Sequence, residues 1–417
     1  MNAPRLLERI PNSRWSQPWL NTAMLEATCS RVVYREGSLR VKIYAAHEAP
    51  ARAQVVLFPS LINRPYILDL GRGRSLIQAL VRSGIEVVLF DWGSPGEAER
   101  DLGLDGLLTG RIPRALSVVH AHSEFSENDR RPRTLMGHCL GGNLALLFAA
   151  QQKSARSKLS IDRLVCLTTP IDTKNSALLN TWFQIPEWNP LQFAQSLETI
   201  PWPLLQASFL MLRPTMTPRR WIQFARRLTE RDFRESWLQM EIWSNDNVSF
   251  SSELFKDLLI PMYRDNAFTT SWRGLATLDV PIFSIAATDD HIVPLESARA
   301  LKAAVPLATH EFHEMRGGHI GAVLSKKTRE KLWPELIQFT CDARKACRTA
   351  QVPLANLSQK SAEKDVAALT REAFQNPSRF AGSSDAHRNS AQARTSVPKT
   401  LRDLKSFENH NAGRVRP

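Results

Sequence analysis

The sequence lacks the features that mark a membrane-spanning chain or one held together by disulfides. Its 417 residues include only five cysteines, at wide spacing and without a CxxC pair, which argues against a disulfide framework or a structural zinc site. No apolar run approaches the roughly 18–20 residues of a membrane span, and residues 1–15 lack the apolar stretch of a signal peptide. We therefore expect a cytoplasmic protein with no transmembrane span.

The charge of the chain is positive and unevenly placed. The sequence carries 54 Lys and Arg against 41 Asp and Glu, a formal net charge of +13. Residues 345–417 hold 13 Lys and Arg against 6 Asp and Glu, and they contain few large apolar residues. This composition predicts a basic, low-complexity tail that is disordered or weakly helical. The overall hydrophobic fraction of 43% is typical of a globular protein.

Short apolar runs alternate with helical segments in the first part of the chain. Residues 31–44 predict a hairpin of two alternating strands. Continuous apolar runs follow at residues 55–58, 86–92, 133–136 and 164–168. Such runs suit strands that are buried on both faces, and helical stretches at 75–83 and 144–152 lie between them. The alternation predicts βαβ units and a mostly parallel sheet.

The alternation stops between residues 173 and 273 and resumes with an apolar run at 280–285. The interrupting segment contains seven of the eleven tryptophans and has a mostly helical pattern. We predict a helical cap of residues 173–273 inserted into an α/β body. Caps of this kind cover pockets for apolar substrates, and the alternative is a helical layer that only buries core. The predicted parts are a lead (residues 1–30), a body in two pieces (31–172 and 274–344), the cap between those pieces (173–273) and the tail (345–417).

The strongest local feature is the run GHCLGG at residues 137–142. It lies between the strand expected at 133–136 and the helix that follows. A nucleophile flanked by glycines on a tight strand-to-helix turn is the nucleophile elbow of α/β-hydrolases. The helix N-terminus favours the thiolate of Cys139, and the amide of Leu140 can donate to an oxyanion. We therefore predict an α/β-hydrolase fold with Cys139 as its nucleophile.

A cysteine nucleophile needs a base and an acid, and in this fold they follow it in the order acid, then histidine. Asp289 and Asp290 follow the strand expected at 282–286, and His319 lies in a glycine-rich loop. We predict His319 as the base and Asp290 as the acid. Asp289 is the alternative, since one aspartate of such a pair commonly caps a turn. The other histidines show no ligand-like spacing, so we expect no metal.

Two further histidines, His138 and His291, stand next to predicted site residues. Both are interpreted as structural or supporting residues. His291 is also a candidate contact for the substrate, because it directly follows the predicted acid.

Several motifs, in this order, resemble those of the polyhydroxyalkanoate synthases, and in particular the short catalytic subunits of the class III and IV type. Residues 59–70, PSLINRPYILDL, are similar to a family segment, PxxIN(K/R)xYILDL, that hydrolases at large lack. Five further segments resemble the family's GxCxGG, LxP, WxxD, acid and histidine motifs: residues 137–142, 209–214, 243–246, 290–294 and 318–320. The resemblance covers roughly residues 30–340.

The resemblance implies an acyltransferase that polymerises (R)-3-hydroxyacyl-CoA into polyester with release of CoA. Cys139 would carry the acyl group covalently, His319 would take the thiol proton, and Asp290 would help to activate the incoming hydroxyl. It implies no cofactor besides the CoA thioester substrate. It also implies a homodimer, a second synthase subunit, and contact with the growing polyester at a granule surface. No module for specific nucleic-acid binding is present.

The loop of residues 59–64 is expected to complete the site. The backbone near Leu61 and Ile62 would give the second oxyanion donor. Asn63 and Arg64 are candidates to hold this loop or to bind the CoA phosphates, and the alternative for Arg64 is a solvated charge.

Two other functions compete with polymerisation. One is a thiol-nucleophile hydrolase of the same fold, such as a depolymerase or thioesterase, and the other is a granule-associated scaffold without activity. Exclusion of water would favour polymerisation over hydrolysis, and the tryptophan-rich cap could provide it.

Overall fold

The computed structural model describes residues 28–342, apart from short gaps. The gaps fall at residues 72, 127–128, 156–158, 175–182, 184, 186–188, 213–221, 223, 271 and 273. The chain divides into two units, Met1–Ala346 and Cys347–Pro417, and every described residue belongs to the first. Most of the predicted lead, the predicted tail and part of the predicted cap therefore lie outside the described residues.

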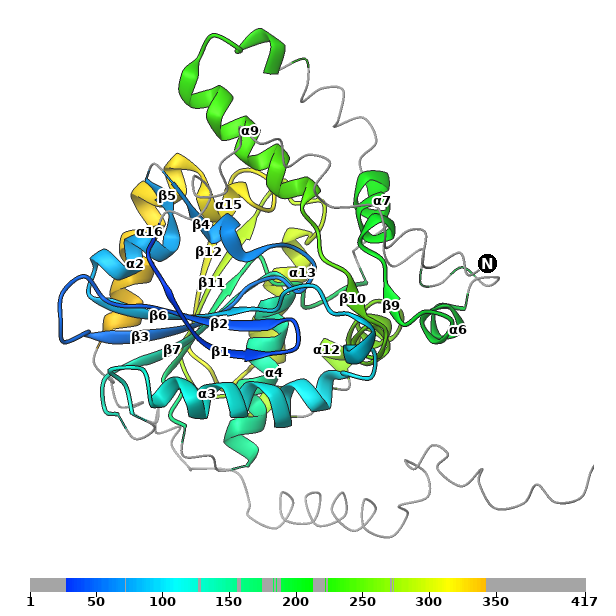
Figure 1. The fold of residues 1–417 in the computed structure, drawn as a ribbon, viewed down its shortest axis with the longest axis horizontal. Coiled ribbons are helices and arrows are strands. Elements are labelled where there is room, and N and C mark those ends of the chain that lie inside the picture. The colour runs from blue at the N-terminus through cyan, green and yellow to red at the C-terminus, as the bar shows by residue number, and fades with distance from the viewer. Residues whose placement is uncertain are drawn as a thin grey trace, which may run out of the picture. The chain divides into compact units, whose positions relative to one another are not determined.

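An eight-stranded sheet lies at the centre of the first unit, in the order β1-β2-β6-β3-β7-β8-β11-β12 (Figure 1). The strands are β1 (Arg31–Glu36), β2 (Leu39–Tyr44), β3 (Ala53–Phe58), β6 (Ile85–Asp91), β7 (Arg133–His138), β8 (Arg163–Leu167), β11 (Ile282–Ala287) and β12 (His310–Met315). β2 pairs antiparallel with β1 and with β6, and the remaining pairs are parallel. The predicted hairpin and mostly parallel sheet are confirmed.

Helices cover both faces of the sheet, and each face has its own apolar core (Figure 1). One core includes residues of α3 (Ile112–His120) and α4 (Leu140–Ser154). The other includes residues of α2 (Leu76–Arg82), α15 (Gly321–Leu324) and α16 (Lys326–Cys341). Apolar side chains on both faces of the central strands are the physical reason for this two-sided cover.

Strand β12 forms one edge of the sheet, and its sequence HEFHEM gives no sign of a strand. The strand contains no apolar run because an edge strand is buried only in part. His310 Nε2 lies 2.7 Å from Ser284 Oγ on β11. The His313 ring stacks on Phe283 with centroids 4.3 Å apart. These two histidines therefore hold β12 to β11.

The described part of residues 173–273 is mainly helical, as its sequence pattern predicts (Figure 1). Its elements are α6 (Pro190–Gln195), β9 (Thr199–Ile200), α7 (Trp202–Leu212), α9 (Arg231–Asn245), β10 (Phe250–Ser251), α10 (Ser252–Leu254), η6 (Phe255–Leu259), α11 (Ile260–Asp265) and α12 (Ala267–Thr270). β9 and β10 pair with each other and not with the central sheet. Trp182, Trp188 and Trp221 lie outside the described residues.

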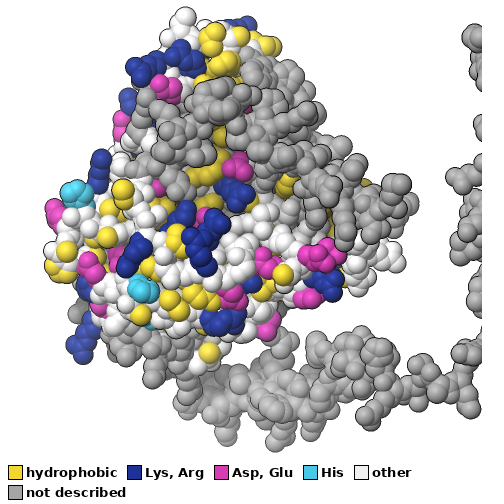
Figure 2. Space-filling model, in the orientation of Figure 1, with side chains coloured by type: hydrophobic (Ala, Val, Ile, Leu, Met, Phe, Trp, Pro, Cys, Tyr) yellow, Lys and Arg dark blue, Asp and Glu magenta, His cyan; other side chains and the backbone are white. Residues whose placement is uncertain are grey.

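Shorter elements connect the strands and helices of the body. They are η3 (Pro65–Leu68), β4 (Asp69–Leu70), β5 (Arg74–Ser75), η4 (Glu97–Glu99), η5 (Gly106–Arg111), η7 (Leu275–Thr277), α13 (Leu295–Arg299) and α14 (Leu301–Ala304). Among the described helices, none is both long enough and apolar enough to span a bilayer. On the face drawn in Figure 2, basic and acidic side chains of the described residues are interspersed.

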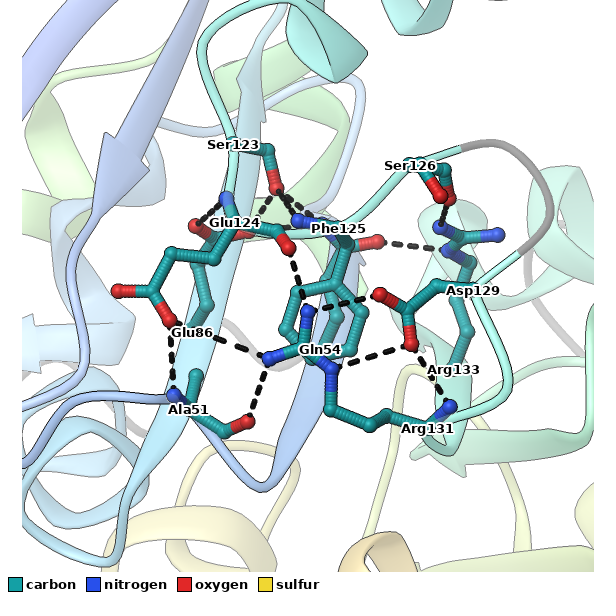
Figure 3. Close-up of polar contacts among 10 residues, drawn as sticks. All are labelled: Ala51, Gln54, Glu86, Ser123, Glu124, Phe125, Ser126, Asp129, Arg131 and Arg133. Carbon is teal, nitrogen blue, oxygen red and sulfur yellow. Dashed lines mark hydrogen bonds and ion pairs between the residues drawn. The ribbon is translucent and has the colours of Figure 1, made fainter.

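A buried polar network lies at the amino ends of the parallel strands, around Gln54, Glu86 and Arg133 (Figure 3). Arg133 is 2% exposed, and its Nε donates to Gln54 Oε1 at 2.7 Å. Arg133 Nη2 donates to the Ser126 carbonyl at 2.8 Å. Gln54 Nε2 in turn donates to Glu86 Oε1 at 2.7 Å. Ligands of open α/β sheets bind at the opposite, carboxyl ends of the strands, so this network is a stabilising one.

We predict that Arg133→Met lowers the free energy of unfolding by roughly 3 kcal/mol, because the change leaves the buried Gln54 acceptor unpaired and removes a buried arginine from its network. Urea unfolding followed by tryptophan fluorescence measures the loss. Arg130→Met, at an exposed position three residues away, is the matched control and should change stability little. Equal losses in the two variants would contradict a stabilising role for the network.

Candidate active site

Cys139 occupies a strained turn between β7 and α4. Its backbone has φ 53° and ψ −126°, a conformation that residues other than glycine rarely adopt. A Cβ on Gly137 would lie 2.3 Å from Gly142 Cα, and one on Gly141 would lie 2.1 Å from the Phe58 carbonyl oxygen. The backbones approach too closely for side chains at these two glycines. The predicted strand–turn–helix around Cys139 is confirmed, and the Cys139 side chain lies at the carboxyl end of β7.

His319 and Asp290 meet in the loops that follow β12 and β11. His319 Nδ1 lies 2.6 Å from Asp290 Oδ2, and both residues are buried. The other carboxylate oxygen of Asp290 accepts the amides of Ile292 at 2.9 Å and Val293 at 3.0 Å. These bonds fix the carboxylate. Cys139, in the turn after β7, acts on His319 through its charge and raises the pKa of the imidazole.

Cys139 and Asp290 both affect the pKa of His319, and His319 in turn affects the pKa of Asp290. Burial disfavours the imidazolium of His319, but Cys139 and Asp290 outweigh burial and raise its pKa to about 10. Burial would raise the pKa of Asp290, yet the charge and hydrogen bond of His319 and the two backbone amides lower it. The imidazolium is therefore the favoured form of His319 at neutral pH, and the carboxylate is the favoured form of Asp290.

The two candidate aspartates differ in their surroundings. Asp290 is buried and contacts His319, whereas Asp289 is exposed and its amide donates to the Gly317 carbonyl at 3.0 Å. The geometry brings Asp290 to the histidine and leaves Asp289 in the turn. His291, the predicted substrate contact, is half-buried in the same loop.

The loop after β3 and the start of α4 come together beside Cys139. Leu140 is the first residue of α4, where backbone amides have no acceptor within the helix. Leu61 and Ile62 are both buried, and the Ile62 amide lies 3.5 Å from Ser60 Oγ. Trp92 Nε1 donates to the Pro59 carbonyl at 3.1 Å and so helps to hold this loop. The start of α4 also approaches this loop closely, because a Cβ on Gly141 would meet the Phe58 and Pro59 carbonyl oxygens.

The same loop is tied to the end of α9, a contact that we call the loop–cap junction and define as Asn63, Arg64, Tyr66, Trp243, Asp246 and Asn247. Arg64 Nε lies 3.3 Å from Asp246 Oδ1, and Tyr66 donates to Asp246 Oδ2 at 3.1 Å. Burial and then the nearby Asp246 raise the pKa of Tyr66, so it remains a phenol and a donor.

Backbone contacts complete the loop–cap junction. Trp243 Nε1 donates to the Arg64 carbonyl at 2.8 Å, and the Val248 amide donates to the Ile62 carbonyl at 3.2 Å. Asn63 Nδ2 donates to Asn247 Oδ1. Arg64 and Asn63 thus contact residues of the predicted cap, which is the arrangement expected if they hold the loop.

Of two further titratable residues near Cys139, the sequence-based prediction does not include Tyr263 and treats His138 only as a supporting residue. Tyr263 on α11 is buried, and its pKa is raised by burial and then by the charges of Cys139 and Asp290. His138, which the sequence suggests only as a supporting residue, lies against His319 with ring centroids 5.6 Å apart. No sequence pattern reveals these contacts, because Tyr263 comes from a distant helix. Among the described residues, no group of three or more Cys, His, Asp or Glu could hold a metal ion.

Comparison with known proteins gives consistent matches for this fold and its family. Residues 56–326 match the model of the alpha/beta hydrolase family. The poly(3-hydroxyalkanoate) polymerase subunit PhaC of Allochromatium vinosum is 30% identical, over 73% of this chain and 86% of that protein. The proteins of the same name from Thiocystis violacea and Haloferax mediterranei are 28% and 26% identical, over 73% and 80% of this chain and 85% and 68% of theirs.

We predict that Asp290→Asn lowers the pKa of His319 from about 10 toward the ordinary value of 6.5, because the change removes a negative charge and weakens a charge-assisted hydrogen bond. A pH titration of the His319 ring resonances by NMR measures the shift, with His319→Gln used to assign them. Asp289→Asn is the matched control and should leave the titration unchanged. A titration that moves in both variants or in neither would contradict the assigned pairing.

Proposed function

The chain belongs to the poly(3-hydroxyalkanoate) polymerase family of acyltransferases, within the alpha/beta hydrolase superfamily, and on this premise we propose how its own residues make a polyester. The substrate is an (R)-3-hydroxyacyl-CoA thioester, and no further cofactor takes part. The observation that carries the proposal is the buried contact of His319 with Asp290, at the end of the sheet where Cys139 occupies its strained turn.

The first half of the reaction loads the acyl group. The Cys139 thiolate attacks the thioester carbonyl carbon, and the backbone amides of Leu140 and of Leu61 or Ile62 stabilise the oxyanion. The bond between the acyl carbon and the CoA sulfur then breaks. The imidazolium of His319 gives its proton to that sulfur, so CoA leaves as a thiol. The products are acyl-Cys139 and a neutral His319.

The second half forms the ester bond. The hydroxyl of a second hydroxyacyl group attacks the carbonyl of acyl-Cys139, and the now neutral His319 takes the hydroxyl proton. The bond to sulfur breaks, Cys139 returns as a thiolate, and His319 is again an imidazolium. Asp290 stabilises the charge that forms on His319, and through it activates the hydroxyl. Atoms and charges balance over the cycle, which adds one hydroxyacyl unit per CoA released.

A thiolate nucleophile suits this acyl transfer between sulfur atoms. Access of water to the acyl group determines whether polymerisation or hydrolysis follows. A thioester is passed from one sulfur to another in the first step, at little cost in free energy. Hydrolysis competes only if water reaches acyl-Cys139. Cys139 is buried, and Tyr263 packs nearby with its ring stacked on Phe183 at a centroid distance of 5.6 Å. This apolar cover supports polymerisation.

The proposal extends to partners. Relatives of this chain are named as subunits, which supports a second synthase subunit for this chain as well. We further propose a homodimer as the active form and a place at the surface of the polyester granule.

The proposed activity predicts polymer and free CoA when the chain is incubated with 3-hydroxybutyryl-CoA, alone or with a candidate partner subunit. Cys139→Ala should lower CoA release by about a thousandfold or more, because the nucleophile is lost. Cys29→Ala, at an exposed cysteine, is the matched control. Free 3-hydroxybutyrate in amounts equal to CoA would identify a hydrolase instead. CoA release by Cys139→Ala at the normal rate would refute Cys139 as the nucleophile.

The loop–cap junction predicts that Asp246→Asn and Arg64→Met each lower kcat about tenfold at little changed KM, because a loosened loop misplaces an oxyanion donor. Their effects should be less than additive, since both break one ion pair. Asp279→Asn, which breaks the exposed pair with Lys153, is the control.

Steady-state kinetics separates the two roles considered for Arg64. A rise in KM for the CoA thioester with normal kcat in Arg64→Met would show that Arg64 binds CoA phosphates. That outcome would contradict the positioning role of the loop–cap junction.

A further inference from the structure

His138 is a buried titratable side chain that the proposed mechanism does not use. It is the last residue of β7, pairs with Leu167 of β8 in the sheet, and is 2% exposed. Its ring lies against the His319 ring, with centroids 5.6 Å apart and a 45° angle between the planes. His138 therefore lies next to the predicted base at the carboxyl end of β7.

The two ring nitrogens of His138 are an exception to the usual rule for buried polar atoms. Neither Nδ1 nor Nε2 has a hydrogen-bond partner within the part of the chain that the structure describes. Unpaired buried nitrogens destabilise a folded protein, and a leucine of similar size would avoid that cost. Packing alone therefore does not account for an imidazole at this position.

The two neighbouring imidazoles differ in protonation: His138 is neutral and His319 is charged. Burial lowers the pKa of His138 most, and the charge of His319 lowers it further. The charge of Asp290 acts in the opposite direction, and the resulting pKa is about 3. His319 keeps its proton for the reasons given above. The titratable groups that act on this pair are Cys139 and Asp290. A neutral imidazole has a strong dipole, with a lone pair on one nitrogen, and buried dipoles act strongly on a nearby charge.

We propose that His138 is a positioning residue that acts through His319. Its neutral ring turns the lone pair of one nitrogen toward the His319 imidazolium and stabilises the charged form that the reaction uses. The nearby charge of His319 thus takes the place of a hydrogen-bond partner. The proposal rests on the proposed roles of Cys139 and His319, and it adds a third residue to Asp290 and Cys139, which raise the pKa of His319.

The test is an NMR titration of His319 in the full chain, in three forms of the protein. His138→Leu removes the dipole at similar volume, and the pKa of His319 should fall by about one unit. His138→Asn restores a polar group near the position of Nδ1 and should recover at least half of that shift. Because the titration needs no substrate, its result does not depend on whether the chain makes polyester.

Two outcomes would overturn the proposal. One is an unchanged His319 titration in His138→Leu. The other is an equal shift in His138→Leu and His138→Asn, which would show an effect of packing and not of the dipole. If His138→Leu does not fold, His138→Met provides the same comparison, with folding checked by circular dichroism.

Discussion

A carboxylate and an imidazole, both buried, face each other at 2.6 Å in the loops after β11 and β12. Neither charge would be stable alone at this depth, since burial raises the pKa of Asp290 and lowers that of His319. Together, and with Cys139 beside them, they remain charged. In the proposed reaction, Cys139 depends on this contact, because a buried thiolate needs a nearby cation to stabilise its charge.

The fold supplies this pair by bringing three strand ends to one place. β7, β11 and β12 are parallel and close in the sheet, so the residues that follow them share one edge. The strained turn at Cys139 points the thiol toward this edge, and two glycines allow the backbones of α4 and the β3 loop to meet. The loop–cap junction then fixes that loop against α9. Strain at one residue is tolerated because the surrounding contacts determine its conformation.

Some of these features can be predicted from the sequence and others cannot, for physical reasons. Strands buried on both faces have continuous apolar runs, so β3, β6 and β8 are visible in the sequence, whereas the polar edge strand β12 is not. The elbow is visible because its glycines are a steric necessity. The contact of Arg64 with Asp246 joins positions 182 residues apart, and Tyr263 approaches Cys139 from the far end of the cap. Such pairings depend on tertiary packing, which no local pattern records.

The central claim is that Cys139 carries the loaded acyl group covalently, and peptide-resolved mass spectrometry after rapid quenching tests it most directly. The chain is mixed with 3-hydroxybutyryl-CoA, quenched and digested under conditions that preserve thioesters. We predict a hydroxyacyl adduct on the peptide that contains Cys139, and no adduct in Cys139→Ala. Release of CoA without an adduct on Cys139, or with an adduct on another residue, would contradict the account.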